Sequence, residues 1–193
     1  MGYFSNAAIF LVETFFGLYI FAVLLRFLLQ RVRADFHNPI AQFLVAVTNP
    51  PLKPLRRMIP GLFGIDLASV LLLLLLEAAR AALIYFLAGQ PFMPAAIAFS
   101  GIVDLLRATI NLFLFAILIR VILSWVNPYP NAATQLLARL TDPLLRPAQR
   151  LIPPFSGVDL SPMLVMIGLV LMQMLIVSPL ADFGAASLGV RLV

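Results

Sequence analysis

The segment VTNPPLKPLRRMIPGLFGIDL (47–67) returns as LTDPLLRPAQRLIPPFSGVDL (140–160), at an offset of 93 residues, without a gap and with ten of 21 positions identical. A biased apolar composition does not explain the match, because the shared residues include Thr, Pro, Arg, Gly and Asp at fixed spacing. A constant offset of this kind indicates a tandem duplication. The candidate motif residues of the two copies are Thr48, Pro50, Pro54, Arg57, Pro60, Gly64 and Asp66, and Thr141, Pro143, Pro147, Arg150, Pro153, Gly157 and Asp159.

The composition is that of a membrane protein. The chain is 63% hydrophobic and 11% charged, with a mean hydropathy of +1.06, whereas a soluble domain carries about 25% charged residues. Apolar runs such as Leu71–Leu76 lack the period of two that barrel strands require, so the predicted fold class is all-α. The chain has no cysteine, which excludes disulfides and thiolate metal sites.

Four apolar stretches are long enough to cross a bilayer, which takes about 20 helical residues. The first repeat is predicted over 1–97 and the second over 98–193, each with two membrane spans. An even number of spans per repeat gives both repeats the same orientation, so the duplication is parallel. The predicted spans are Ala7–Leu29, Leu67–Ala88, Gly101–Val126 and Ser161–Pro179. We interpret the first of them as a retained span rather than a removed signal peptide.

Positive charge is concentrated between the two spans of each repeat. Six of the 13 Lys and Arg residues lie from Arg26 to Arg57, and four more lie from Arg120 to Arg150. The positive-inside rule therefore predicts that both long loops are cytoplasmic and that both termini lie outside. Membrane topology accounts for this excess of basic residues in the loops, so nucleic-acid binding is not expected. Arg26 and Arg120, near the ends of spans, are expected to snorkel to the interface.

The loops are rich in proline, which blocks a helix interior. In the first loop, Asn38-Pro39 is typical of a helix N-terminus. The helix that it starts is expected to stop near Thr48, and a second short piece is expected over Pro54–Ile59, with counterparts at Asn131–Thr141 and Pro147–Ile152. Such short pieces favour interfacial helices, since they are too short to span a bilayer.

The order Asn-Pro, Gln, Thr-x-Pro-x-Leu-x-Pro, Arg-x-Ile-Pro and Gly-x-Asp, found twice between four spans, resembles the YggT family of YlmG-like integral membrane proteins. The resemblance implies a multi-pass protein of the bacterial cytoplasmic (inner) membrane linked to tolerance of osmotic and envelope stress. For plastid relatives it implies roles in assembly of membrane complexes and in nucleoid organisation. The chain departs from the family pattern at Gln149 and at Ala68-Ser69.

The charged residues of the repeat each allow two interpretations. Asp66 and Asp159 are expected to cap the helices that follow, and ion or proton binding is the alternative. Arg57 and Arg150 are expected either to contact anionic lipid headgroups or to set topology and pair with the aspartate nine residues later.

Glu77 and Arg80 are the clearest charged pair outside the repeat. Their spacing of three places them on one helix face in mid-span, where an isolated charge costs at least about 2.5 kcal/mol. A neutralised pair that locks helix packing is favoured, with an ion path as the alternative. His37 has no companion ligands, so neither a metal nor another cofactor is expected.

These observations favour a non-enzymatic scaffold, assembly or stress-tolerance factor that acts through two cytoplasmic Pro/Arg loops. Its expected partners are the bilayer, anionic headgroups, and an unidentified protein or a second copy of the chain. The alternative is a small ion or solute channel or transporter, with Glu77 and Arg80 near its path.

Overall fold

The computed structural model describes residues 2–62, 64–126, 129–151 and 159–188. Four helical segments in it are long and apolar enough to cross a membrane. They are α1 (Tyr3–Arg31), α3 (Leu67–Leu87), α4 (Pro94–Val126) and a fourth segment in three parts: α6 (Ser161–Met172), a π-helical turn η1 (Gln173–Val177) and α7 (Ser178–Leu188). The predicted all-α class with four spans is confirmed.

Two predicted span boundaries are wrong, both at prolines. The third span begins at Pro94 rather than Gly101. The fourth does not end at Pro179 but continues to Leu188. Proline lacks the N–H that its helix would use, and the π-helical turn before Pro179 absorbs the misfit, as such turns do inside longer helices. The Ser178 hydroxyl donates to the Gln173 carbonyl over 3.1 Å in this turn.

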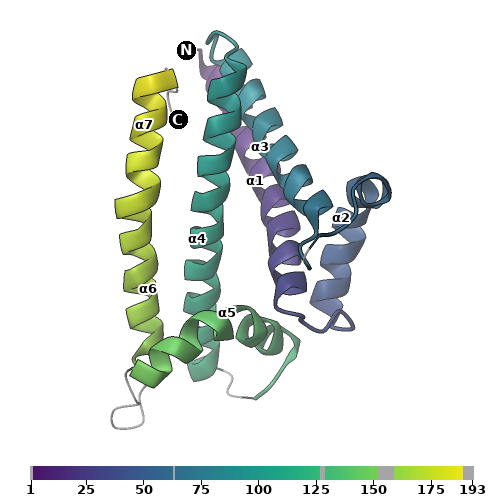
Figure 1. Ribbon diagram of the computed structural model, residues 1–193, viewed down its shortest axis with the longest axis vertical. Helices are drawn as coiled ribbons and strands as arrows, with labels where there is room; N and C mark the ends of the chain where they lie inside the picture. Colours follow the sequence, from purple (N-terminus) through teal and green to yellow (C-terminus); the bar gives the residue numbers. More distant parts are fainter. Residues whose placement is uncertain (1, 63, 127–128, 152–158, 189–193) are drawn as a thin grey trace.

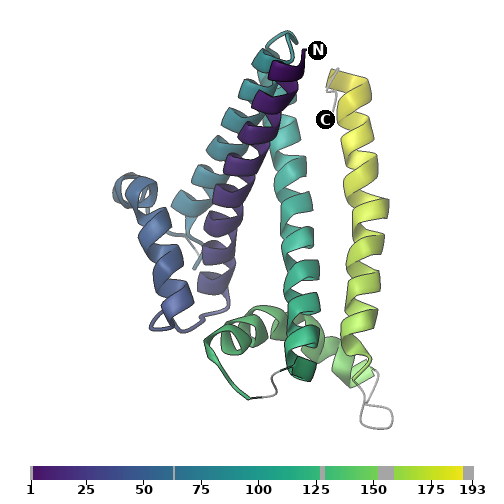
Figure 2. The same ribbon diagram turned by 180° about the vertical axis from the view of Figure 1, so that it is seen from behind.

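The two repeats run parallel, as the even span count predicts. Helices α2 (Pro39–Met58) and α5 (Ala132–Leu151) connect the spans of each repeat, and both lie at one end of the molecule (Figure 1). The described parts nearest the two termini lie at the other end, which the reverse view also shows (Figure 2). Both proline-rich loops therefore belong to the same face of the protein.

Each proline-rich loop forms one continuous helix, so the prediction of two short pieces is wrong. Helix α2 contains three internal prolines, and α5 contains Pro143 and Pro147. Interior prolines bend a helix without always ending it, and both helices change direction along their length in Figure 1. The predicted start of α2 is confirmed, since the Asn38 side chain accepts a hydrogen bond from the Ile40 N–H over 2.9 Å.

The proline bends of α2 are supported from the first span. Pro51 cannot donate to the Val47 carbonyl, four residues before it. The Tyr19 hydroxyl of α1 donates to that carbonyl instead, over 3.3 Å. A helix with missing internal hydrogen bonds thus obtains replacements from the span beside it.

The spans do not form a closed four-helix bundle. Helix α3 packs against both α1 and α4, whereas among the described elements the fourth span contacts only α4 and α5. One buried apolar cluster joins α1, α2, α3, α4 and α5, and includes Val23, Leu52, Leu73 and Leu112. A second cluster joins α4 to the fourth span around Val103, Ile117 and Val177. The three spans α1, α3 and α4 therefore pack together, and this core carries the charged cleft described below.

Candidate functional site

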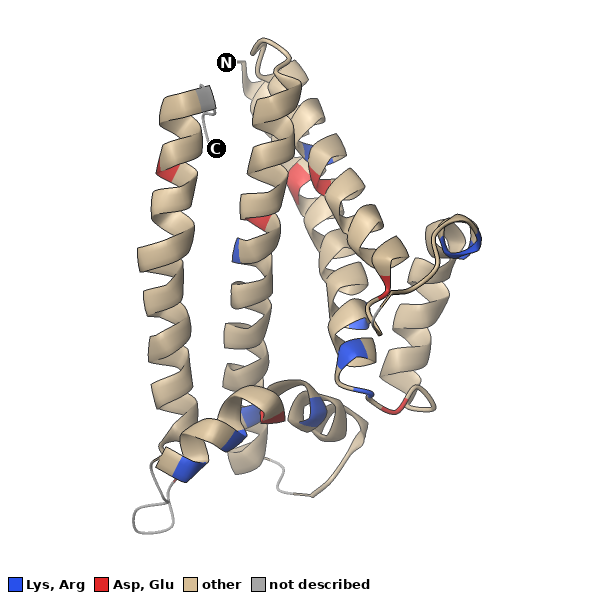
Figure 3. Cartoon of the chain, in the orientation of Figure 1, with Lys and Arg blue, Asp and Glu red and all other residues tan. Residues whose placement is uncertain are grey.

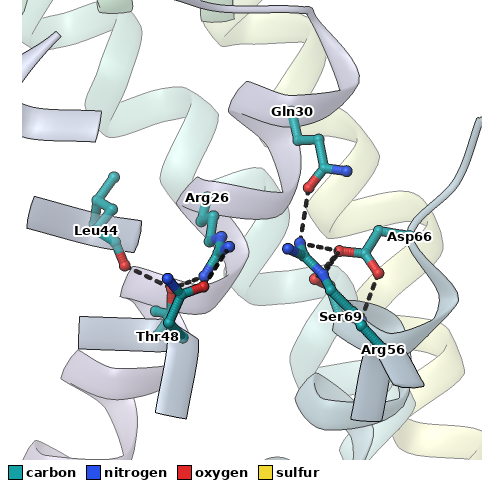
Figure 4. Close-up of polar contacts among 8 residues, drawn as sticks. Arg26, Gln30, Leu44, Thr48, Arg56, Asp66 and Ser69 are labelled. Carbon is teal, nitrogen blue, oxygen red and sulfur yellow. Dashed lines mark hydrogen bonds and ion pairs between the residues drawn. The ribbon is translucent and has the colours of Figure 1, made fainter. Parts of the chain in front are cut away.

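Arg26 anchors the first loop helix to the first span. Its guanidinium is buried, with the residue only 4% exposed. It donates to Thr48 Oγ1 over 2.6 Å and to Asn49 Oδ1 over 2.9 Å, and the Thr48 hydroxyl donates in turn to the Leu44 carbonyl (Figure 4). Hydrogen bonds from a charged donor are stronger than neutral ones. The motif residue Thr48 is therefore the acceptor that fixes α2 against α1.

The second repeat contains the same anchor. Arg120 of α4 donates to Thr141 Oγ1 over 2.6 Å and to Asp142 Oδ1 over 2.7 Å. Thr141 repeats Thr48, and Asp142 stands where the first copy has Asn49. The predicted snorkelling of Arg26 and Arg120 is wrong, because both guanidinium groups bind loop helices. Their offset of 94 residues differs by one from that of the motif, so a gapless comparison does not align them.

A second polar contact holds the end of each loop helix near the start of the next span. In the first copy, Arg56 Nε donates to Asp66 Oδ2 over 3.0 Å, its Nη2 also binds Asp66, and Nη2 donates to Gln30 Oε1 over 3.1 Å (Figure 4). In the second copy, Gln149 Nε2 donates to Asp159 Oδ2 over 2.8 Å. An amide thus takes the place of the guanidinium where the chain departs from the family pattern.

The predicted pairing of Arg57 and Arg150 with these aspartates is wrong. The partners are Arg56 and Gln149, ten residues before each aspartate instead of nine. One residue is about 100° of rotation in a helix, so the next side chain leaves the face that meets the aspartate. Arg57 and Arg150 are both exposed.

Asp66 is the N-cap of α3, as predicted, whereas Asp159 lies one residue before Leu160, the N-cap of α6, and still binds the first residue of that helix. Asp66 accepts from the Ser69 N–H over 3.3 Å and from the Ser69 hydroxyl over 2.7 Å, and Asp159 accepts from the Ser161 N–H over 2.9 Å. Burial raises the pKa of Asp66, but hydrogen bonds from Arg56 and Ser69 and the charge of Arg56 outweigh it and hold this pKa below its ordinary value. The pKa of Asp159 is also lowered, since bonds from Ser161 and Gln149 outweigh burial. Both carboxylates are ionised at neutral pH.

The remaining motif residues shape the backbone. Pro50, Pro54, Pro143 and Pro147 lie inside the loop helices. Pro60 follows α2, and Gly64 has φ of 75° in the turn that returns the chain to α3. That conformation is favourable for glycine and costly for other residues. Pro153 and Gly157 lie outside the described residues.

The spacing of Glu77 and Arg80 predicts an ion pair, and the structure contains one, with 2.8 Å between Arg80 Nη2 and Glu77 Oε2. Sequence reasoning missed its continuation. Arg80 Nη2 also donates to Asp104 Oδ2 over 2.9 Å, and Asp104 lies 3.4 Å from Arg107 Nη1. Asp104 and Arg107 have the same three-residue spacing within a span as Glu77 and Arg80, and this spacing could have predicted the second pair. Figure 3 shows acidic and basic positions at this level of α3 and α4, apart from those around the loop helices.

These charges line a cleft of about 520 Å³ between α1, α3 and α4. Gly101 brings α4 close to α3 here, since a Cβ at this position would lie 3.3 Å from Glu77 Cβ. Glu13 of α1 also lines the cleft, together with polar groups of Tyr85, Ser100 and Asn111. Towards the loop helices its wall turns apolar, with Phe21, Leu24, Leu112 and Phe115.

The described chain thus combines repeated anchors for two bent loop helices with one charged cleft between spans. The CCB3/YggT family profile matches it twice, over residues 5–87 and 99–180. The chain is 44% identical to an uncharacterised protein of Pseudomonas aeruginosa over 181 residues, which are 92% of this chain and 91% of that protein. It is 39% identical to the uncharacterised protein YggT of Escherichia coli K12 over 170 residues, 88% of each chain. No solved structure matches it. The two family matches coincide with the two repeats, and the chain is a multi-pass membrane protein of the CCB3/YggT family.

Proposed function

We propose that this protein is a non-enzymatic membrane scaffold or assembly factor that supports tolerance of osmotic and envelope stress. Its contact face is formed by α2 and α5, with the exposed arginines Arg57 and Arg150. The observation that carries the proposal is the Arg–Thr anchor, present in both repeats. A fixed pair of bent helices on one face suits a docking platform better than a catalytic site, which would need convergent reactive groups.

The exposed side chains of the loop helices suit a membrane surface or a partner that lies on it. Helix α2 exposes Phe43 and Met58, which are 65% and 79% exposed, beside Lys53 and Arg57. Helix α5 exposes Arg146, Arg150 and Leu151. Apolar and basic groups on one amphipathic helix are typical of segments that lie in the interface of anionic membranes. Anionic headgroups, and a protein or second copy docked beside them, are therefore the proposed partners, and no nucleic acid is among them.

A small ion or solute channel or transporter is the second candidate function. The charged cleft supports it, because ionisable residues within spans commonly mark substrate or ion paths. We favour the scaffold because the repeated elements are the loop helices, whereas the cleft lies between α1, α3 and α4 and so combines both spans of the first repeat with one span of the second.

The proposed location is the bacterial cytoplasmic membrane, with α2 and α5 in the cytoplasm and both termini outside. We expect single cysteines placed at Lys53 and Arg146 to react with an impermeant maleimide only after the cytoplasmic side is exposed, because the charge bias of both loops has the same sign. The parent chain has no cysteine to interfere. Tyr3→Cys, at a residue that is 95% exposed near the other end, should react in intact spheroplasts. Opposite accessibility of positions 53 and 146 would exclude this topology.

The contact face is tested by Arg57→Gln, Arg150→Gln and the double variant. Each basic residue near an anionic surface gains about 1 kcal/mol, so the double variant should lose stress tolerance most. Abundance should stay near the parental level, because neither exposed arginine holds a helix in place. Survival in high salt of a deletion strain carrying each variant, with immunoblots for abundance, measures both effects.

Arg31→Gln is the matched control, since it removes an exposed charge at the same end of the molecule but outside the motif. Lysine at 57 and 150 should restore function if charge alone is required. Full stress tolerance of the double glutamine variant would reject the proposed face.

A further inference from the structure

The cleft between α1, α3 and α4 contains an unequal number of opposite charges. Its wall carries three carboxylates, Glu13, Glu77 and Asp104, and two guanidinium groups, Arg80 and Arg107. Three negative and two positive groups leave one negative charge in excess. Both guanidinium groups already contact carboxylates of the cleft. In the described part of the chain, Glu13 is the cleft carboxylate for which no hydrogen bond or ion pair is found.

A single carboxylate on the wall of a cleft within the membrane lacks the stabilisation that a paired charge has. Two further polar groups of residues that line the cleft are buried and have no hydrogen-bond partner among the described residues, the Tyr85 hydroxyl and Arg80 Nε. Buried polar groups without hydrogen-bond partners are uncommon in folded proteins, and a binding site for a ligand is one reason for them. Glu13 and Tyr85 line the same space, so a ligand in that space would lie against both.

The size and the wall of the cleft restrict the class of ligand. A cleft of about 520 Å³ falls in the range of small-molecule sites, about 300–1,000 Å³, and is much larger than a bare ion. Among the described residues no three His, Asp or Glu side chains gather closely enough to hold a metal ion. The rings of Phe21, Tyr85 and Phe115 line it instead, and aromatic faces attract ammonium groups.

We propose that this cleft binds a small organic ammonium cation, with the Glu13 carboxylate as its counter-charge and the aromatic rings around its apolar substituents. The Glu77–Arg80–Asp104–Arg107 chain is the scaffold of this site, because its charges already compensate one another. The site is independent of the proposed role of α2 and α5, which lie at the end of the spans.

The test is ligand binding to the full-length protein in nanodiscs. Tetramethylammonium is the probe, and tert-butanol is a neutral molecule of similar shape. Isothermal titration should show saturable binding of tetramethylammonium to the parent and none of tert-butanol. Glu13→Gln should weaken binding about tenfold or more, since it removes the charged partner. Asp182→Asn, which neutralises an exposed carboxylate of α7 outside the cleft, should leave binding unchanged.

Glu13 makes no hydrogen bond or ion pair within the described chain that its replacement would break, so the Glu13→Gln variant, which keeps the size of the side chain, should keep the parental thermal stability. That measurement separates a lost ligand site from a lost fold. Equal binding by Glu13→Gln and the parent would overturn the proposal. Equal binding of tert-butanol, or displacement of the probe by equimolar K⁺, would also overturn it, because the site would then not recognise an organic cation.

Discussion

Replacing Arg80 by Met is expected to lower the free energy of unfolding by about 3–5 kcal/mol, the range found when one partner of a buried ion pair is removed. Arg80 Nη2 contacts both Glu77 and Asp104, and the Glu77 side chain is only 3% exposed. The methionine leaves Glu77 without a counter-charge inside a span and leaves Asp104 with only the longer contact to Arg107. Pulse proteolysis in mixed micelles with increasing dodecyl sulfate measures the loss.

Two further variants make this prediction specific. Arg107→Met is the matched control, since Arg107 lies 3.4 Å from Asp104 and its side chain is 34% exposed. It should cost less than about 1 kcal/mol, as for exposed pairs. Adding Glu77→Gln to Arg80→Met should recover most of the stability, because Glu77 then carries no charge and Asp104 keeps Arg107 as its counter-charge. If Arg80→Met is as stable as Arg107→Met, the charge network does not hold α3 to α4.

The second large effect is expected at Arg26. Arg26→Met removes two hydrogen bonds from a charged donor, to Thr48 and Asn49. Each bond of this type contributes about 1.5–3 kcal/mol, so a loss of about 3 kcal/mol is expected. Because these bonds fix α2 to α1, trypsin should also cleave faster after Arg56 and Arg57 of α2. The same unfolding assay and a time course of limited proteolysis measure the two effects.

Arg120→Met provides the internal comparison for this anchor. The Arg120 side chain is 28% exposed, and Asp142 keeps a second contact with Arg146 at 3.0 Å. A smaller loss, about 1–2 kcal/mol, is therefore expected in the second repeat. Arg26→Lys should recover only part of the loss, since an ammonium does not present the two-pronged geometry of guanidinium. Parental stability and parental cleavage of Arg26→Met would show that α2 is held by apolar contacts alone.

The path of the two loops was the part of the fold that was hardest to predict from the sequence. Proline is a reliable signal against an ideal helix interior, yet α2 and α5 continue through their prolines. The replacement donor for one freed carbonyl comes from Tyr19, a residue of another helix. A local rule cannot include a partner that only the fold brings near.

The same limit explains why the partner of Asp66 is Arg56 and not the predicted Arg57. Repeat identity singled out Arg57 and Arg150, because those positions match. Position 56 is Arg in one copy and Gln in the other, so identity passed over it, although both side chains donate to the equivalent aspartate. Chemical equivalence without identity becomes visible only when the helix register is known.

The sequence by itself determined that the chain crosses a membrane four times, that it does so as two parallel repeats, and that Asp66 and Asp159 begin the spans after the loops. Those features follow from the length of the apolar stretches, from the repeated motif and from the residues that favour helix starts. Each of these signals can be recognised in a short segment of sequence. Only the tertiary structure decided which partner each charge has. Arg26 binds Thr48, Arg80 binds Asp104, and Glu13 faces a cleft with no ion-pair partner among the residues that the structure describes. These contacts depend on how separate helices pack within an apolar medium, where an unpaired charge is costly.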